Sequence, residues 1–477
     1  MRKSWLFLMV GGLIIALGVG LVKFGFPKAT QNQDQQTDFK ILDEMYQIIE
    51  DEAVYRVPKP TLIEGALRGM VDMIEDPYST YFTSEEAAIH RESLASERVG
   101  IGAEITRSNG KYLIVSPVKS SPAEKAGLQP YDEIIKIDDT PVQQASLDEV
   151  IAKIRGKEGT VVTLTIYRPS INKHLEISVM RALIPMETVA HAVIEQNDQT
   201  IGYISITTFG EETAEEWQQA TKKLVAKQID GLVIDVRGNP GGYLYSVSQL
   251  ASSLLEKETV FSYMEDVDGT LTPLITEQTD DLPFEEQLKT VPIVLLQDQG
   301  SASASEVLSG ALKDHKRAVI IGDKSFGKGT VQESYELSNG GELKLSTHKW
   351  LTPKKEWIHG KGVLPDIEAA QPKLFQSHLK VLAETYKKGE FHEDIAYAQT
   401  LLKELGYKTT REDGYFDGST SKALLAFQKK KNLKKVNQMN PEFFRALKEE
   451  VERYRSKVEN DLQLQMALDY FGKQLKS

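Results

Sequence analysis

Three serines stand at alternate positions in GSASASE, residues 300–306, between an apolar run and a segment with helical spacing. A serine hydroxyl becomes a nucleophile when a neighbouring base removes its proton. Backbone N–H groups at a helix start have no helical partner, so they can stabilise an oxyanion that forms there. Ser303 and Glu306 equally match the S-x-x-E capping box of an ordinary helix. The stretch alone leaves a catalytic serine and a helix cap both open.

A lysine is the best candidate for the base. We find none of the eight histidines in the glycine-punctuated, strand-end context that positions catalytic side chains. Lys328 has this context, because in GDKSFGKGTVQ it lies between Gly327 and Gly329, after the apolar run RAVIIGD. Ser/Lys pairs are a known form of serine catalysis. A lysine base must be neutral, which near neutral pH requires its pKa to fall by roughly three units, a shift that burial can produce.

The same loop also has to be compared with a phosphate-binding loop. Gly322, Gly327 and Lys328 match G-x-x-x-x-G-K, but Gly329 stands where a hydroxyl must hold magnesium. The chain has no cysteine, so thiol catalysis and zinc–thiolate sites are excluded. We therefore disfavour an ATP-dependent enzyme and expect neither a metal nor another cofactor.

A third glycine-rich stretch, DVRGNPGGYL at residues 235–244, lies at the end of the most apolar predicted strand. A tight turn after a strand explains such glycines without any chemistry. Alternatively, Gly241 or Gly242 lets the backbone come close enough to donate an N–H to a substrate oxygen, since glycine has no Cβ.

Apolar strands that alternate with helices must position these three loops. GYISITTF, GLVIDV, VPIVLLQD and RAVIIGD have the composition of buried strands. Residues 211–227 have helical spacing, with an inward face predicted at Ala214, Trp217, Thr221 and Leu224. Unbroken apolar strands between helices are typical of a sheet that is covered on both faces. We predict an α/β core over residues 183–370.

The regions before and after this core differ in pattern. Residues 28–97 predict a polar linker and helices, with Leu42, Met45, Ile48 and Ile49 on one apolar face. Residues 98–182 alternate with a period of two and predict a compact αβ unit with two helices. Residues 371–477 are mainly helical in pattern. The fold class is therefore a multidomain chain with α/β and α+β parts.

The N-terminus indicates the compartment. Arg2 and Lys3 precede 18 uncharged residues, Trp5 to Val22. As a helix this run is about 27 Å long, enough to span a bilayer core. No A-x-A cleavage site follows, which favours an anchor over residues 1–27 rather than a cleaved signal. We expect a single-pass cell-membrane protein whose domains lie outside the cytoplasm, or a secreted chain if the segment is cut.

NPGG, GSASASE and FGKGTVQ, in this order and spacing, resemble the carboxyl-terminal processing or tail-specific proteases over residues 38–370. The resemblance implies a Ser/Lys peptidase without a cofactor. In it Ser303 attacks, Lys328 is the base and Gln332 orients the lysine by a hydrogen bond. Members of this type occur in spore-forming Gram-positive bacteria, which implies regulated proteolysis or sporulation signalling.

The resemblance also assigns roles to the residues around the nucleophile. The oxyanion hole would combine the N–H of Ala304 with that of Gly241 or Gly242. Ser301 and Ser305 would shape the turn and cap the helix.

The unit over residues 98–182 resembles a PDZ domain, through VGIGAEI and SSPAEKAGLQPYDEIIKIDD. Such domains add a peptide strand to a sheet edge and hold its terminal carboxylate on backbone N–H groups. The resemblance places this nest at Gly100, Ile101, Gly102 and Ala103. Arg168 is a candidate sensor of bound peptide, with a solvated strand-end arginine as the alternative.

Residues 385–450 resemble a peptidoglycan-binding-like domain, through AQTLLKELGY and DGYFDGSTSKALLAFQKKKNL. Asp417 stands where the pattern has glycine, so peptidoglycan binding, domain packing and a homodimer all remain open. The helical tail, residues 451–477, could support either domain packing or a homodimer.

These features together predict an extracytoplasmic serine endopeptidase with a PDZ gate. It would cleave protein substrates with free C-termini, near or from those ends. The net charge of −12 argues against a nucleic-acid partner. The rival is a pseudoprotease scaffold that binds C-termini without cleavage, against which Ser303, Lys328 and Gln332 count.

Overall fold

The computed structural model describes residues 35–474 apart from 89–96, 109, 119–120, 144, 146, 170, 186, 197, 278–282 and 378. The predicted anchor, Trp5 to Val22, lies outside the described residues. Within the described part of the chain, no helix combines the length and apolar character that a bilayer crossing requires.

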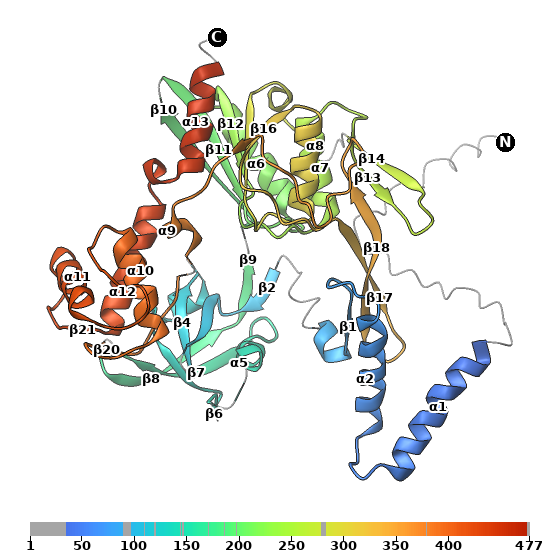
Figure 1. Cartoon of the computed structure of the whole chain (residues 1–477), viewed down its shortest axis with the longest axis horizontal. Helices are drawn as coiled ribbons and strands as arrows, with labels where there is room; N and C mark the ends of the chain where they lie inside the picture. Colours follow the sequence, from blue (N-terminus) through green and yellow to red (C-terminus); the bar gives the residue numbers. More distant parts are fainter. Residues whose placement is uncertain are drawn as a thin grey trace, which may run out of the picture.

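A six-stranded sheet forms the centre of the α/β core (Figure 1). Its order is β10–β11–β12–β15–β16–β19, with β10 and β11 antiparallel and the other neighbours parallel. The two central strands, β12 and β15, are buried along their whole length, as their unbroken apolar sequences predict. The strands are β10 (Val189–Gln196), β11 (Gln199–Ile206), β12 (Gly231–Asp235), β15 (Ile293–Gln297), β16 (Ala318–Gly322) and β19 (Ile367–Glu368).

Helices cover both faces of this sheet. On one face lie α6 (Thr213–Val225), α7 (Leu244–Leu254) and α8 (Ala304–Asp314), which share one apolar core with the sheet. The predicted inward face of α6 is confirmed, since all four of its residues are buried. The other face is covered by the C-terminal helix α13 (Leu462–Gln474), whose Leu468 and Phe471 pack with Val233 and Leu296.

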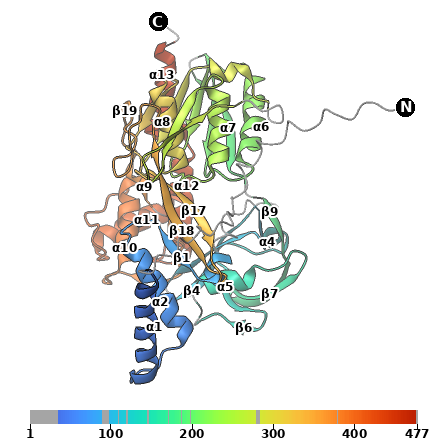
Figure 2. The same cartoon turned by 90° about the vertical axis from the view of Figure 1, so that its right-hand side faces the viewer.

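A second sheet begins at the edge of this core. β17 (Thr330–Glu336) and β18 (Glu342–Leu351) form a long hairpin that descends from the core towards the N-terminal helices (Figure 2). β18 also pairs with β1 (Thr80–Phe82) and β13 (Val260–Glu265), and β13 pairs with β14 (Leu271–Ile275). The short η1 (Glu286–Lys289) precedes β15.

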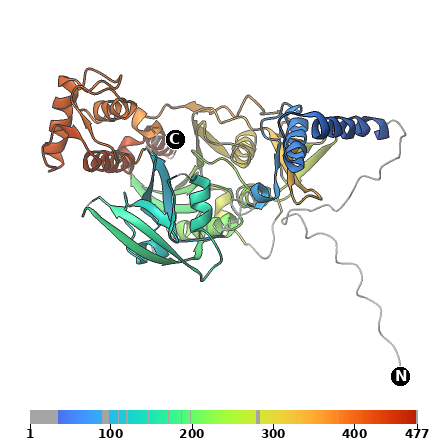
Figure 3. The ribbon, with the colours of Figure 1, turned by 90° about the horizontal axis from the view of Figure 1, so that it is seen from below.

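The N-terminal helices α1 (Gln35–Glu52) and α2 (Lys59–Asp72) form an arm at the end of the molecule opposite the C-terminal domain (Figure 3). The helices are as predicted, but their apolar faces are not buried. Met45 is 54% exposed and Met73 78% exposed.

The αβ unit is built on a six-stranded antiparallel sheet with the order β3–β4–β5–β7–β8, in which β6 pairs with β5 outside this path. Strand β3 lies at its edge, and a two-stranded ribbon of β2 and β9 joins the unit to the core. Its elements are β2 (Glu97–Gly100), β3 (Ala103–Ser108), β4 (Lys111–Pro117), α4 (Pro122–Lys125), β5 (Glu133–Ile137), β6 (Thr140–Pro141), α5 (Leu147–Ile154), β7 (Val161–Arg168), β8 (Lys173–Met180) and β9 (Ala182–Pro185).

The C-terminal domain is a small helical unit with its own aromatic core, which includes Phe416, Phe427 and Phe443. Tyr131 of the αβ unit packs with Leu113 and Val381, so the two domains touch. The elements are α9 (Lys373–Gln376), β20 (Tyr386–Lys387), α10 (Glu393–Glu404), α11 (Gly418–Lys430), β21 (Gln438–Met439), α12 (Pro441–Arg455) and η2 (Val458–Asn460).

The helical tail has the packing role that the sequence left open. The apolar face of α13 is buried against the sheet of its own chain. The homodimer stays a prediction.

Candidate active site

Ser303 is the residue at which the loop after β15 turns into α8. Its φ is +54°, a left-handed conformation that non-glycine residues rarely adopt. Such strain persists only where surrounding contacts enforce it, and it is common at functional sites. Ser303 is partly exposed, whereas Ser301 and Ser305 are fully buried.

The two buried serines hold the turn in place. Ser301 Oγ donates to the carbonyl oxygen of Val236 at 2.8 Å, and Ser305 Oγ donates to that of Asn239 at 3.0 Å. Both acceptors lie in the DVRGNPGG stretch. The two serines therefore tie the nucleophile turn to the glycine loop, and of the three serines only Ser303 is open to solvent.

Glu306, in the first turn of α8, is 1% exposed and joins the serine turn to the lysine loop. Its Oε2 accepts from the backbone N–H of Ser303 at 2.9 Å and from that of Lys328 at 2.8 Å. Its Oε1 accepts from Ser325 Oγ and from the N–H of Gly327, both at 2.6 Å. The sequence suggested only a capping role for this glutamate, and that role is present.

Lys328 lies in the loop between β16 and β17 and is partly buried. Its pKa is lowered, first by burial and second by the positive charge of Lys344, while Asp76 and Glu306 act in the opposite direction. The lysine Nζ lies 5.1 Å from the centre of the Tyr78 ring. A lowered pKa is what a neutral lysine base requires.

Gln332 lies on β17. We expected its side chain to bind Lys328, but it binds two other residues. Its Nε2 donates to Thr330 Oγ1 at 3.1 Å and to Ser346 Oγ at 3.3 Å. Among the described residues, no side-chain hydrogen bond joins Gln332 to Lys328 or Lys328 to Ser303. Catalytic hydrogen bonds often form fully only when substrate is bound.

Both glycines of NPGG have positive φ values and pack where a side chain would not fit. A Cβ on Gly241 would lie 2.8 Å from Ser303 Cβ, so the glycine loop rests directly against Ser303. The N–H of Gly241 donates to Asn239 Oδ1 at 2.9 Å. Gly242 is exposed, and within the described chain no hydrogen bond occupies its N–H or that of Ala304.

The predicted carboxylate nest lies where β2 crosses into β3. Gly102 has a φ of +71°, and a Cβ there would lie 2.4 Å from Ser121 Cβ. The carbonyl oxygen of Ile101 accepts from the N–H of Ala123, and that of Gly102 accepts from Ser121 Oγ. Ala103 opens β3, the edge strand to which a peptide could be added.

Arg168 is neither solvated nor in the nest itself. Its Nε and Nη2 donate to the two carboxylate oxygens of Asp132, each at 2.7 Å, and Nη2 also donates to the carbonyl oxygen of Gly127 at 2.8 Å. Its side chain is 13% exposed, so the alternative of a solvated arginine is wrong. Arg168 holds the turn after α4, the helix that contacts Ile101.

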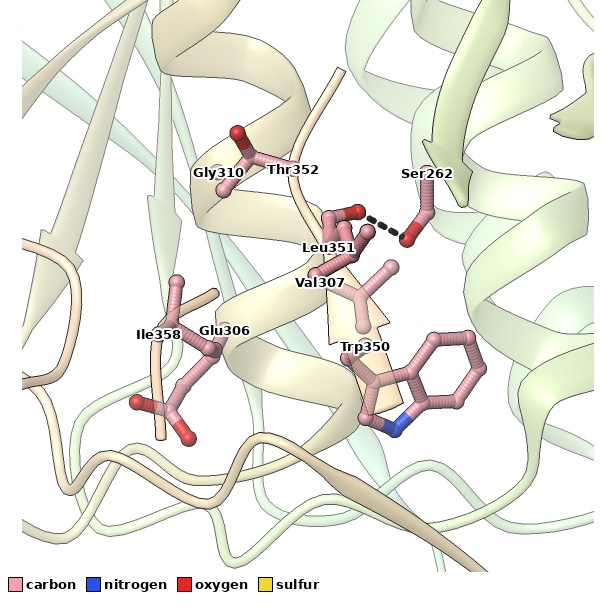
Figure 4. A pocket seen from close by; sticks show the side chains of 8 residues that line it. All are labelled: Ser262, Glu306, Val307, Gly310, Trp350, Leu351, Thr352 and Ile358. Carbon is pink, nitrogen blue, oxygen red and sulfur yellow. Dashed lines mark hydrogen bonds between the residues drawn. The ribbon is translucent and has the colours of Figure 1, made fainter. Parts of the chain in front are cut away.

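A small cavity lies behind the first turns of α8, between this helix and β18 (Figure 4). Ser262 Oγ donates to the carbonyl oxygen of Leu351 at its edge. Figure 4 shows the Glu306 carboxylate pointing away from Ser262 and Trp350. Since neither Ser303 nor Lys328 lines the cavity, it is a gap in packing and not the place of the chemistry.

Sequence reasoning missed the residues that approach Lys328 from elsewhere in the chain. Tyr78 comes from the N-terminal segment DPYSTYF, and His359 lies against the lysine loop, where a Cβ on Gly329 would be 2.6 Å from its backbone nitrogen. The glycine after His359, in WIHGKG, was a signal for this histidine that we did not weigh.

Family models divide the chain in the same way as the fold. That of peptidase family S41 matches residues 200–369, and that of the PDZ domain matches residues 99–179. A model of the activating protease CtpB N-terminal domain matches residues 23–86, and one of a peptidoglycan binding domain matches residues 391–446.

Whole-chain relatives agree with these matches. The carboxy-terminal processing protease CtpB of Bacillus subtilis (strain 168) is 40% identical over 97% of this chain and 96% of the relative. CtpA of the same organism is 35% identical over 92% and 91%. The solved photosystem II D1 C-terminal processing protease is 28% identical, with a TM-score of 0.45, over 70% of this chain and 87% of that one. Its identity to CtpB and CtpA over more than nine tenths of its length shows that the chain belongs to the carboxy-terminal processing proteases of peptidase family S41, which makes it a serine peptidase.

Proposed function

We propose that Ser303 is the nucleophile and Lys328 the general base of this peptidase. Neutral Lys328 takes the proton of Ser303 Oγ as that oxygen attacks the scissile carbonyl carbon. The lysine ammonium then gives the proton to the leaving amine, and a water that neutral Lys328 deprotonates releases the acyl group. Gln332 orients the lysine once substrate is bound. The observation that carries the proposal is the Glu306 carboxylate, which holds the backbones of Ser303 and Lys328 through one oxygen.

The oxyanion hole is assigned to the N–H groups of Ala304 and Gly242. Two neighbouring candidates come from NPGG, but the N–H of Gly241 already donates to Asn239. Gly242 is exposed on the same loop, and its contact with the Phe209 backbone leaves no room for a side chain. A fixed donor of this kind stabilises the charge that develops in the transition state.

Four alanine variants test the Ser/Lys assignment. Ser303→Ala and Lys328→Ala should abolish cleavage of an unstructured protein without changing the thermal unfolding curve. Ser301→Ala and Ser305→Ala should retain most activity, because neither hydroxyl takes part in the proposed chemistry. Ser301 loses the hydrogen bonds to Val236 and from Asp298, and Ser305 loses the one to Asn239, each worth about 1 kcal/mol. Full activity in Ser303→Ala, or equal losses in all three serine variants, would refute the assignment.

The PDZ domain is proposed to gate this activity by binding the substrate's C-terminal carboxylate at Gly100, Ile101, Gly102 and Ala103. The left-handed Gly102 turn, which glycine adopts without strain, and the edge position of β3 support this mode. Amidating the C-terminus of a peptide removes the charge that backbone N–H groups would bind, at about 1.5 to 3 kcal/mol for each charge-assisted bond. We expect amidation to slow cleavage about tenfold or more. Equal cleavage of the free and amidated peptides would overturn the gate and leave the Ser303 assignment standing.

The proposed location is the cell membrane, with residues after about Lys28 outside the cytoplasm. The charges and apolar run of the N-terminus support this topology. A reporter fused after residue 28 should be extracytoplasmic and should fractionate with the membrane. A role in regulated proteolysis or sporulation would follow from the substrates found there.

A homodimer is proposed through the N-terminal arm. Ile41, Met45 and Ile48 are 60%, 54% and 56% exposed and share one face of α1, an apolar surface that a second copy would cover. Sedimentation of a chain that starts at residue 35 tests this.

The C-terminal domain is proposed to bind peptidoglycan, which a cell-wall pull-down with and without residues 385–450 tests.

A further inference from the structure

The segment Asp76–Phe82 leaves the helical arm and enters the catalytic region. β1 pairs antiparallel with β18, and Thr80 lies opposite Lys344. Ser79 Oγ donates to Asp76 Oδ2 at 2.6 Å and accepts from the backbone N–H of Ser346 at 3.1 Å. Ser346 in turn accepts from Gln332 at 3.3 Å. The segment is thus fixed to β18, the strand that carries Ser346, the hydrogen-bond partner of Gln332.

Tyr78 projects from this fixed turn onto the lysine. The N–H of Tyr78 donates to Asp76 Oδ1 at 3.2 Å, which sets the direction of the residue. Lys328 Nζ lies 5.1 Å from the centre of the Tyr78 ring. Tyr78 is itself partly buried, so one side of the amine faces an aromatic surface in place of water.

Two further aromatic rings support Tyr78 from behind. His359 meets the Tyr78 ring edge-on at 6.2 Å and stacks on Trp357 at 5.1 Å. Trp357 Nε1 donates to the carbonyl oxygen of Gly329, the residue after Lys328, at 2.8 Å. The three rings of Tyr78, His359 and Trp357 are therefore in contact one after another. The first lies against the Lys328 amine, and the last binds the backbone of the next residue, Gly329.

We propose that Tyr78 is a positioning residue for the general base, its ring covering the Lys328 amine and keeping water from it. The inference rests on the proposed role of Lys328. It makes the N-terminal segment part of the catalytic apparatus, because the arm supplies a group that the S41 core between residues 200 and 369 lacks.

Two opposing effects of the Tyr78 ring act on the pKa of Lys328, and their balance decides how that pKa changes when the ring is removed. An aromatic face attracts an ammonium by about 0.5 to 2 kcal/mol, which favours the charged lysine. Excluding water disfavours the charged form, and burial is the largest cause of the lowered pKa of Lys328. The charged groups around the amine are Lys344, which lowers the pKa further, and Asp76 and Glu306, which raise it. Removing the ring admits water, so the pKa of the base should rise.

The test is the pH profile of kcat/KM for an unstructured protein substrate. Tyr78→Ala should lower kcat/KM at neutral pH by about ten- to a hundredfold. The difference in kcat/KM between the variant and the wild type should shrink as the pH rises, because a higher pKa of Lys328 moves the rising part of the pH profile to higher pH. Tyr78→Phe keeps the ring and should restore most of the activity and the original profile. Tyr335→Ala, which removes an aromatic ring from β17, is the matched control and should leave the profile in place.

Each outcome decides between the alternatives. A loss in Tyr78→Ala that is equal at every pH would overturn the inference and mean a structural role. Equal impairment of Tyr78→Phe and Tyr78→Ala would also overturn the inference, because Tyr78→Phe keeps the ring. If Tyr78→Ala does not fold by thermal unfolding, Tyr78→Leu carries the same comparison, with a smaller shift in the same direction. Cleavage by Lys328→Ala would instead refute the proposed base, whatever Tyr78 does.

Discussion

The backbone N–H groups of Ser303 and Lys328 donate to the same atom, Oε2 of Glu306, at 2.9 and 2.8 Å. The two residues are 25 positions apart in the sequence, and one buried carboxylate sets the distance between their backbones. The proposed nucleophile and its proposed base are therefore held by the start of the same helix, α8.

Glu306→Gln should damage catalysis more than binding. Four donors surround the carboxylate, and an amide replaces one acceptor oxygen by a group that itself donates. An unsatisfied buried donor costs about 1 to 3 kcal/mol, so the loops should shift to relieve it. We expect kcat to fall at least about tenfold, with a smaller change in KM, because misplaced groups lose reactivity before they lose substrate.

Glu333→Gln, at an exposed glutamate of β17, is the control for this experiment. A Glu306→Gln variant with normal kcat would mean that Ser303 and Lys328 do not depend on this bridge.

The central sheet could be predicted from sequence because its signals are local. Each core strand is a short apolar run, and the helical period of residues 211–227 places Trp217 inward without knowledge of any partner. The GSASASE turn could be located for the same reason. Its three serines, the cap at Glu306 and the following helix all lie between Ser301 and Asp314.

The remainder depends on contacts between distant segments, which local patterns do not encode. Tyr78 meets Lys328 from 250 positions away, and Phe471 covers a sheet that begins at Val189. The choice between the two glycines of NPGG depends on the direction of one side chain, Asn239. The arm shows the opposite case. Its apolar helical faces indicate burial, but the part of the chain that the structure describes leaves Met45 and Ile48 more than half exposed.

The charge of Lys344 should tune the pH dependence of the reaction. The pKa of Lys328 is lowered first by burial and then by Lys344. The neutral base is the active form, so kcat/KM should rise with pH through the pKa of Lys328. Lys344→Met removes the like charge and raises that pKa, which should move the rising limb to higher pH and reduce activity below it.

Lys354→Met, at an exposed lysine that pairs with Asp314, should leave the limb in place. A limb that stays fixed or moves to lower pH in Lys344→Met would show that this charge does not act on the base.

The Arg168–Asp132 pair should stabilise the PDZ domain. Asp132 has a fully buried side chain, and Arg168→Ala would leave its charge without a partner. Breaking such a pair from one side costs about 3 to 5 kcal/mol, whereas removing both members costs much less. We expect hydrogen exchange in β5 and β7 to accelerate strongly in Arg168→Ala and only slightly in the double variant Asp132→Ala/Arg168→Ala.

The double variant also tests peptide sensing by Arg168. If it regains stability but no longer distinguishes free from amidated peptides, Arg168 contributes to carboxylate recognition beyond holding the turn after α4. If the distinction returns with stability, the role of Arg168 is structural.

Asp461 should fasten the tail helix to the catalytic half of the sheet. Its two oxygens accept from Arg237 at 2.9 and 2.8 Å, and Arg237 also binds Asp235 at the end of β12. Burial alone would raise the pKa of Asp461, but the hydrogen bonds and charge of Arg237 lower it below its usual value. A lowered carboxyl pKa contributes stability that is complete above the unfolded-state pKa and is lost as the pH falls through the folded-state pKa.

Asp461→Asn should therefore reduce the free energy of unfolding at neutral pH by about 1 to 3 kcal/mol, because a charged hydrogen-bond acceptor is lost. The difference from the wild type should narrow in acid, where the wild-type carboxyl becomes protonated as well. Denaturant unfolding at several pH values measures this, with Asp469→Asn on the exposed face of α13 as control. A difference that is constant with pH would mean that Asp461 acts through packing and not through its charge, since only an ionised carboxylate gives the predicted slope.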